Sequence, residues 1–471
     1  MADLSFLSLA ELSRELAAGT TSSREIVDTF LARIDALDGR LHAFVDVYRD
    51  AARAGADAAD AERRGGISRG PLAGLPIALK DLLHLAGHQT TGGSKSWRGR
   101  ISDHTATCVQ RLIAAGMIPL GKTHLVEFAF GGWGRNEPMG APWNPWDTRV
   151  HRVAGGSSSG SAVATAAGLA PAAIGSDTGG SVRIPAGLNG LTGLKTTFGL
   201  ISLYGAVPLS GTLDTIGPIA HTAEDAALLT AAMAGPDPRD PGTRDAPLFD
   251  LDAALADVAG VRGMRITALS AAQFPTGVSS DALAARAAMI AALTNLGARV
   301  EEAHVPIDFD DVMARNGSLI ATEAYAVHRA YIEDAALPID PWVRKRMVSG
   351  KGIAAADYID ELAARRRAEA SFTAWMRDRD ALLTPTLPIA AIPLDDVDEN
   401  TTPLANFTRA ANYLGACALS LPGPRGASGL PFGVQLIGAP FADAKLLRIG
   451  RAVQQTTDWH RARPDLSAWQ K

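Results

Sequence analysis

The sequence predicts an α/β protein with a large buried core. Its 471 residues are 47% hydrophobic and 20% charged, which is the composition of a soluble globular protein. Short apolar runs typical of buried strands alternate along the chain with longer helix-like segments. This length fits two or three average domains, or one large α/β unit.

Composition argues against several classes of function. A net charge of −5 argues against a generic binder of nucleic acid or of an anionic membrane. The first residues show no signal peptide, and the most apolar window, 162–174, is too short and too rich in Ala and Gly to span a bilayer. Cys108 and Cys417 lack metal-ligand spacing and are expected to be reduced, although a bond between them stays open. We therefore expect a cytoplasmic protein.

The N-terminal part is predicted to be helical before the first buried strand. Two Ser-x-x-Glu capping boxes, at Ser8 and Ser22, begin two helices, and a third helix runs to about Arg64, where two glycines end it. Residues 75–79 predict a buried strand, and Lys80 follows directly in an apolar setting. Taken alone, Lys80 is better explained as a lysine whose head reaches solvent from the end of a strand.

Residues 116–123 match the Walker A pattern letter for letter. A phosphate loop needs a strand before it, free N–H groups within it and a helix after it. Here a helix over 105–115 precedes the match, Pro119 lacks an N–H, and the interior is Met-Ile-Pro-Leu. We interpret 117–120 as a strand, and not as part of a nucleotide site.

The remaining elements alternate between strand and helix. They are an irregular segment over 127–147, short strands and turns over 188–219, a helix over 222–234, strands over 264–269 and 299–305 around a helix over 281–296, mostly helix over 309–378, strand character over 381–392, a strand over 432–437 and a helix over 442–455. A Pro- and Gly-rich linker over 235–242 is the best internal boundary. The acidic residues within 395–399 predict a solvated loop rather than a metal site.

Two loops rich in glycine and serine flank a run of small residues over 162–173. The first loop, 155–161, has the sequence GGSSSGS, and the second, 175–185, has the sequence GSDTGGSVRIP. Glycines let backbone N–H groups approach a ligand closely, and a helix N-terminus adds unpaired donors and partial positive charge. These features suit the stabilisation of an oxyanion beside an activated serine.

Three interpretations of these loops compete. In the first, 156–160 is the nucleophile elbow of an α/β-hydrolase with Ser158 attacking, but no supported strand or downstream histidine accompanies it. In the second, both loops are structural turns with solvent-facing serines. The third combines Lys80, Ser157 and Ser181 into a proton relay.

The third interpretation is favoured because several long motifs, in the right order, resemble those of the amidase signature family. The matching motifs are Gly74-Leu75-Pro76 with Lys80-Asp81, Gly121-Lys122-Thr123 with Glu127-Phe128, Asn144-Pro145-Trp146-Asp147, the two serine loops, Gly193-Leu194-Lys195-Thr196, and Gly429-Leu430-Pro431 with Gly433-Val434-Gln435. The resemblance covers about residues 5–460 and is tightest over 70–220. It implies one large α/β/α unit with a twisted, mostly parallel mixed β-sheet core surrounded by helices.

Four segments of this single domain are implied by the resemblance. Residues 1–69 are N-terminal helices packed on the core, and 70–235 form the signature core with the catalytic residues. Residues 236–378 are a mostly helical insertion that shapes one side of the cleft. Residues 379–471 supply C-terminal strands and a helix that complete the core.

The resemblance also implies residue roles, and it implies no metal and no organic cofactor. Ser181 is the acyl-accepting nucleophile, and Ser157, on a cis peptide after Gly156, connects it to the base Lys80. The implied oxyanion hole consists of the backbone N–H groups of Thr178, Gly179, Gly180 and Ser181, and the implied supports are Ser158, Asp177 and Arg183.

The relay makes a physical demand on Lys80. A lysine with the ordinary pKa of about 10.4 cannot accept a proton at neutral pH, so its pKa must fall by about 3 units. Burial is expected to supply part of this shift, and positive potential from the helix N-terminus near Ser159 the rest.

Substrate and partners are predicted less directly. Phe130, Gly131, Trp133 and Tyr204 are expected to line the pocket, and together with Trp97 they suggest an aryl amide or a carbamate. The expected protein is a stand-alone amidase that acts on a small-molecule amide without nucleic acid or membrane, and a homodimer stays open.

The alternative is the catalytic A subunit of a glutamine-dependent tRNA amidotransferase, which resembles the same core. Ala405 aligns where that subunit carries an acidic residue for the substrate ammonium group. This difference favours the stand-alone amidase.

Overall fold

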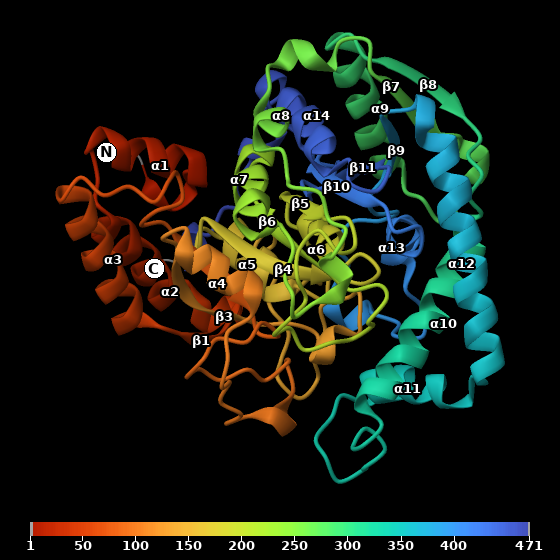
Figure 1. Cartoon of the computed structure of the whole chain (residues 1–471), viewed down its shortest axis with the longest axis horizontal. Helices are drawn as coiled ribbons and strands as arrows, with labels where there is room; N and C mark the ends of the chain where they lie inside the picture. Colours follow the sequence, from red (N-terminus) through yellow and green to blue (C-terminus); the bar gives the residue numbers. More distant parts are fainter. Residues whose placement is uncertain (1–2, 470–471) are drawn as a thin grey trace.

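One mixed β-sheet of eleven strands runs through the molecule, and helices pack against it (Figure 1). The computed structural model describes residues 3–469. The strands are β1 (Phe44–Val47), β2 (Pro76–Lys80), β3 (Ile118–Thr123), β4 (Ala172–Asp177), β5 (Thr192–Lys195), β6 (Thr215–Ala220), β7 (Arg265–Leu269), β8 (Arg299–Ala303), β9 (Ala381–Pro385), β10 (Cys417–Pro422) and β11 (Gly433–Gly438). Their order in the sheet is β1-β3-β2-β4-β6-β5-β10-β11-β9-β7-β8.

The helices predicted over 105–115, 222–234, 281–296 and 442–455 are present with similar bounds, whereas α8 (Leu251–Leu255) and α13 (Arg409–Tyr413) were not predicted. They are α1 (Leu9–Ala18), α2 (Ser23–Leu41), α3 (Arg49–Arg64), α4 (Thr107–Ala114), α5 (Ser159–Ala166), α6 (Arg183–Leu188), α7 (Ala223–Met233), α8 (Leu251–Leu255), α9 (Ser280–Asn295), α10 (Phe309–His328), α11 (Pro341–Val348), α12 (Ala355–Trp375), α13 (Arg409–Tyr413) and α14 (Asp443–Thr456). Both predicted capping boxes form, with Ser8 and Ser22 as the capping residues. No helix in the described part of the chain is long and apolar enough to cross a membrane.

The sheet is mixed, but the expectation that it is mostly parallel was wrong. The parallel pairs are β2 with β3 and β4, and β7 with β8 and β9. The centre of the sheet is antiparallel, because β6 returns beside β4, and β5, β10, β11 and β9 continue that alternation. β1 also pairs antiparallel, at one edge. The chain therefore turns back on itself in the middle of the sheet without crossover helices between every pair of strands.

Two neighbouring parallel strands position the serine loops. β2 and β4 pair through Ala78 and Ala173, so they run in the same direction and end at the same edge of the sheet. β2 ends at Lys80 and β4 ends at Asp177. Ligands of α/β sheets commonly bind at the carboxyl ends of such strands. The lysine and the second serine loop thus meet at one edge.

The Walker-like match is mostly a strand, as its composition predicts. Residues 118–123 form β3, which pairs with both β1 and β2. The Lys122 ammonium is buried and donates to the Leu83 carbonyl at 2.6 Å and to Thr90 Oγ1 at 3.0 Å. Its donors are therefore committed to the protein rather than to a phosphate.

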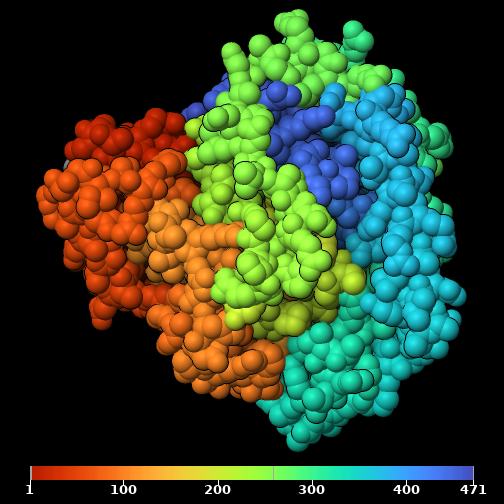
Figure 2. All heavy atoms as spheres, in the orientation of Figure 1, coloured from red at the N-terminus to blue at the C-terminus, as the bar shows by residue number. Residues whose placement is uncertain are grey.

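The segment 236–378 contains, besides its helices, the two strands that the sequence predicts within it. It contributes β7 and β8 to one edge of the common sheet, where β7 pairs with β9. Its long helices α10 and α12 lie along one side of the molecule, opposite the N-terminal helices α1–α3 (Figure 1). In the space-filling view, a green segment that includes α7 lies between these two sides (Figure 2). Cys108 and Cys417 are both free and buried, as expected.

Candidate active site

Lys80 is enclosed at the end of β2, where its ammonium contacts two serine hydroxyls. The whole residue is buried, with 0% of its surface exposed. Its Nζ lies 2.8 Å from Ser157 Oγ and 2.8 Å from Ser176 Oγ. The lysine therefore does not reach solvent, and its contact with Ser157 is the first half of the predicted relay. The second contact, with Ser176, has no counterpart in the sequence prediction.

Burial lowers the pKa of Lys80 to about 7, since removing water disfavours the charged amine. The neighbouring charges that bear on it, Asp177 and Asp214, act in the opposite direction and raise the pKa. The expectation that positive potential helps to lower this pKa is therefore corrected. Burial alone lowers the pKa, and its effect is larger than the opposing effect of the two carboxylates. Near neutral pH a large fraction of this amine is neutral and can accept a proton.

Ser157 and Ser158 lie just before the start of α5, in the first serine loop. The peptide bond between Gly156 and Ser157 is cis, as expected. Ser158 donates its backbone N–H to the Ser181 carbonyl at 3.2 Å, and its hydroxyl lies 3.3 Å from the backbone N of Ser176. Ser158 is fully buried between the two serine loops, so it joins them and is not the exposed nucleophile of a hydrolase elbow.

Ser181 borders a small cavity, whereas Lys80 and Ser157 lie buried behind it. Ser181 keeps 8% of its surface exposed. The cavity is lined by Ala129, Phe130, Gly131, Gly132, Thr178, Gly179, Ser181, Ile184, Leu209, Ile320, Arg346, Thr402, Ala405 and Arg409. A molecule in this cavity can reach Ser181 without reaching the lysine, which is the arrangement that a nucleophile with a shielded base requires.

The four predicted oxyanion donors differ in availability. The Gly180 N–H already donates to Asp177 Oδ1 at 2.7 Å, so the expectation that it is free for an oxyanion is corrected. In the described residues, the N–H groups of Thr178, Gly179 and Ser181 have no acceptor. Thr178 and Gly179 also line the cavity. These three remain candidates for an oxyanion hole.

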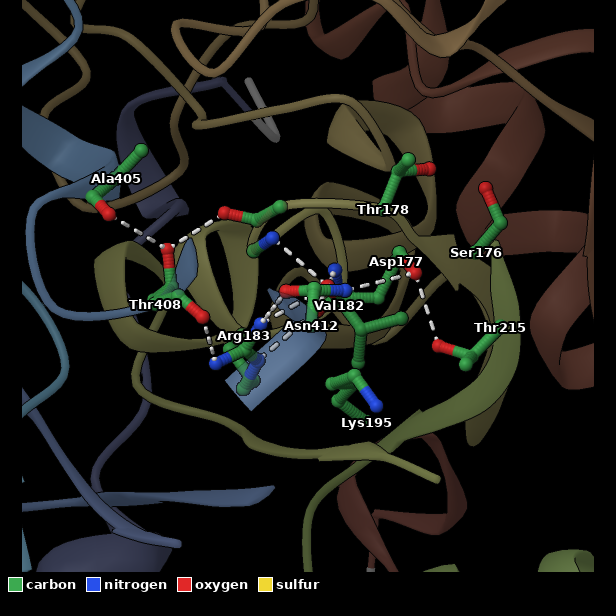
Figure 3. A network of polar contacts seen from close by, with 12 residues as sticks. Ser176, Asp177, Thr178, Val182, Arg183, Lys195, Thr215, Ala405, Thr408 and Asn412 are labelled. Atoms are coloured by element: carbon green, nitrogen blue, oxygen red, sulfur yellow. Dashed lines mark hydrogen bonds and ion pairs between the residues drawn. The ribbon is translucent and has the colours of Figure 1, made fainter. Parts of the chain in front are cut away.

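Asp177 and Arg183 form a fully buried ion pair that holds the second serine loop (Figure 3). The guanidinium donates to both carboxylate oxygens at 3.0 Å. The same carboxylate accepts the backbone N–H of Gly180 and that of Val182 at 3.1 Å. The Arg183 guanidinium is the main favourable cause that holds the pKa of Asp177 well below its ordinary value, against the opposing effect of burial. The predicted supporting positions of both residues are consistent with these contacts.

The C-terminal part of the chain completes this network. Asn412 accepts from Arg183 at 2.6 Å and donates to Asp177 at 2.9 Å. Thr408 donates its hydroxyl to the Gly179 carbonyl at 2.7 Å, and Figure 3 shows it beside Ala405 and Arg183. Residues that lie more than two hundred positions after Ser181 in the sequence thus hold the loop that carries it.

Two of the four predicted pocket residues line the cavity, and two do not. Phe130 and Gly131 line it together with Ser181. Trp133 is buried one layer behind, packed in a cluster with Ile184, and its Nε1 donates to the Thr401 carbonyl at 3.1 Å.

The other predicted aromatics lie elsewhere. Tyr204 packs against His104 and beneath Arg239, away from the cavity. Trp97 packs on Phe128 and also lies outside the cavity wall. Of the four aromatic side chains that suggested an aryl substrate, Phe130 alone lines the cavity, so the wall gives that suggestion little support.

The cavity wall also contains residues that sequence reasoning missed. Arg346 on α11 and Arg409 on α13 both line it. Arg346 pairs at 2.9 Å with Glu399, which belongs to the acidic stretch expected to be solvated and whose side chain is only 6% exposed. No local pattern marks these residues, because tertiary packing brings them to Ser181 from distant helices.

Comparison with known proteins gives consistent matches along the chain. A family model for amidases matches residues 25–447. A curated protein of Chloroflexus aggregans, named as the A subunit of glutamyl-tRNA(Gln) amidotransferase, is 38% identical over 500 residues, 99% of this chain and 100% of that protein.

Solved structures resemble this fold over nearly its whole length. One, described as an unexpected vestigial protein complex that reveals the origins of an s-triazine catabolic enzyme, has a TM-score of 0.89 at 35% identity, over 98% of this chain and 100% of its own. Another, the A subunit of glutamyl-tRNA(Gln) amidotransferase from Thermotoga maritima, has a TM-score of 0.81 at 31% identity, over 97% and 96%.

Proposed function

The chain belongs to the amidase signature family, and from this membership we propose that it is the amide-cleaving A subunit of a glutamine-dependent tRNA amidotransferase. The relatives that support this proposal match from end to end: the first covers 99% of this chain and 100% of its own length. The buried lysine at Ser157 supports the amide-cleaving chemistry. We also propose that the protein works in the cytoplasm.

The stand-alone amidase predicted from the sequence is corrected by these comparisons. The curated relatives at 38% identity are named as one subunit of an amidotransferase that acts on glutamyl-tRNA(Gln), so the expectation of a lone enzyme without nucleic acid is wrong. A structural relative at 35% identity is likewise described as a protein complex. The difference at the single position Ala405 weighs less than a similarity that covers 99% of the chain.

In the proposed reaction, Ser181 Oγ attacks the carbon of a primary carboxamide. Its proton passes through the Ser157 hydroxyl to the neutral Nζ of Lys80. The developing oxyanion accepts hydrogen bonds from backbone N–H groups of the second serine loop. The C–N bond then breaks, and the proton returns by way of Ser157 to the nitrogen, which leaves as ammonia. An ester on Ser181 remains, and water hydrolyses it to a carboxylic acid.

The contact between Lys80 Nζ and Ser157 Oγ, at 2.8 Å, carries this proposal. A charged lysine at this place would donate to the serine and could not remove its proton. Because burial lowers the pKa of Lys80 to about 7, the neutral form is available near neutral pH. Burial of the amine by the fold is thus what allows Lys80 to act as the base.

Ammonia release from glutamine tests the proposal, with the purified chain alone and with the remaining subunits of the enzyme added. We expect release to depend on the added subunits, and Ser181→Ala to reduce it by about a thousandfold or more. Ser159→Ala is the matched control, since this neighbouring serine is buried and its hydroxyl has no partner in the described residues. Glutamine hydrolysis that survives Ser181→Ala, or that no added subunit changes, contradicts the proposal.

A further inference from the structure

A positively charged group without a carboxylate partner lies in the wall of the cavity at Ser181. Among residues 3–469, no acidic side chain pairs with Arg409, and its Nη1 donates to the Met313 carbonyl at 2.8 Å. The other cavity arginine, Arg346, already pairs with Glu399. Arg409 therefore has donors to spare, since a guanidinium carries five N–H groups.

The surroundings of Arg409 favour an incoming anion. Burial is the main cause that lowers the pKa of Arg409 to about 10, and the nearby positive charge of Arg346 adds to it. Arg409 remains half-buried because one side of it borders the cavity. A cation in such a place is stabilised when an anion binds beside it.

Asn316 on α10 does not line the cavity itself, but it carries a second set of unused polar atoms next to Gly179, which does. It is fully buried, with 0% of its surface exposed, and both atoms of its side-chain amide lack a partner in the described residues. A Cβ placed on Gly179 would lie 3.3 Å from Asn316 Oδ1 and 3.4 Å from Arg409 Cγ. The amide and the arginine therefore flank the same glycine of the serine loop. Buried amides are normally hydrogen-bonded, so this one lacks a partner that a ligand can supply.

The cavity offers nothing comparable for a cation. None of the described residues that line it is an Asp or a Glu. Ala405, at the position where a carboxylate for an ammonium group was considered, is buried with an apolar methyl side chain. Apolar side chains of Phe130, Ile184 and Leu209 form other parts of the wall and suit a short chain of methylene groups.

We propose that Arg409 and Asn316 form a subsite for a carboxylate of the amide donor, so that the donor is the monoamide of a dicarboxylic acid, bound without recognition of an α-ammonium group. This inference rests on the proposed amide cleavage at Ser181, because it concerns the same cavity. It differs from that proposal because it concerns how the amide donor is bound and not how its amide is cleaved. Glutamine satisfies the carboxylate requirement, but glutaramate, which lacks its amino group, satisfies it equally.

Binding to a full-length Ser181→Ala variant tests the inference separately from the chemistry. Isothermal titration calorimetry compares three ligands: glutaramate, glutamine, and pentanamide, in which a methyl group replaces the carboxylate. We expect glutaramate to bind at least about tenfold more tightly than pentanamide, because hydrogen bonds to charged groups are strong in a buried site. We expect glutaramate to bind at least as tightly as glutamine. Equal binding of glutaramate and pentanamide, no binding of glutaramate, or much tighter binding of glutamine overturns the inference.

A second substitution identifies the residue responsible. Arg409→Met, added to Ser181→Ala, should bring the affinity ratio of glutaramate to pentanamide close to one, whereas Arg409→Lys should retain part of it. Arg286→Met is the control, because Arg286 on α9 is an arginine outside the cavity wall that donates to the Leu269 carbonyl at 2.7 Å and already pairs with Glu302 at 2.9 Å. A folded Arg409→Met protein, checked by circular dichroism, that keeps the wild-type ratio rejects the subsite. Calorimetry measures binding and not ammonia release. The carboxylate subsite can therefore be rejected without rejecting the proposed amide cleavage, and the reverse is also true.

Discussion

At Lys80 the requirement of the proposed chemistry opposes the stability of the fold. The unfolded chain keeps this amine charged at pH 7, whereas burial lowers its pKa to about 7 in the folded protein. By linkage, the free energy of unfolding falls as the pH decreases from about 10 to about 7, at a total cost on the order of 4 kcal/mol. Groups with strongly shifted pKa values collect at functional sites, which is consistent with the proposed role of Lys80.

The pH dependence of the reaction tests the role of Lys80. The neutral amine is the acceptor, so kcat/KM for amide cleavage should rise with pH through about 7 and then level off. Lys80→Met should lose at least about a hundredfold in kcat/KM. It should also unfold at a temperature no lower than that of the wild type, because it removes a costly buried amine. Ser159→Ala should keep the wild-type profile. A profile that is flat between pH 6 and pH 8 would contradict the assignment of Lys80 as the base.

At the scale of elements, the antiparallel centre of the sheet supports the serine loop. Thr215 begins β6 and donates its hydroxyl to the Asp177 carbonyl at 2.9 Å, at the end of β4. β6 also pairs with β5 through Gly193 and Ile219, so the order β4-β6-β5 holds the loop from one side. The small residue Gly217 is required there, because a Cβ at this position would overlap the Leu194 carbonyl of β5.

Gly217→Ala should therefore destabilise the protein by about 1–3 kcal/mol, since the added methyl group forces β5 and β6 apart. Gly211→Ala is the control, because a Cβ there meets nothing within 4 Å, and its effect should stay below about 0.5 kcal/mol. Urea unfolding followed by circular dichroism measures both. Equal stability of the two variants would show that the strands tolerate the extra group.

At the scale of the molecule, a buried carboxyl group joins the N-terminal helix α1 to α7, a helix that packs against the sheet. Asp225 on α7 accepts the backbone N–H of Ala10, at the start of α1, at 2.9 Å. Its second oxygen has no partner in the described residues. Burial raises the pKa of Asp225 to about 7, so the folded protein holds a proton there that the unfolded chain releases near pH 4.

This shift predicts how stability changes with pH. Because the folded-state pKa is the higher one, the free energy of unfolding should fall as pH rises from about 4 to about 7, by up to about 4 kcal/mol, and change no further above that. Asp225→Asn should remove this contribution, so the loss of stability between pH 5 and pH 8 should be smaller than in the wild type. Asp252→Asn, at an exposed position, is the control. Identical pH dependence in the wild type and Asp225→Asn would reject the effect.

Sequence reasoning succeeded where a few neighbouring residues determine the structure. The capping boxes at Ser8 and Ser22 formed as predicted, because the atoms that make them lie three residues apart. It failed for β10, a buried strand of Cys417–Pro422 that no alternation or turn marked in advance. The strand character expected over 381–392 was right only as far as Pro385. Fully buried strands lack the alternating pattern that identifies a half-exposed one.

The amino-acid sequence by itself determined the family, the strand that carries Lys80 and the serine motifs, because these depend on the order of residues along the chain. Tertiary structure decided what surrounds them. It removed water from Lys80, occupied the Gly180 N–H with Asp177, kept Trp133 and Tyr204 out of the cavity wall, and brought Arg409 into it. Burial and charge depend on contacts between distant segments, which no local pattern in the chain contains.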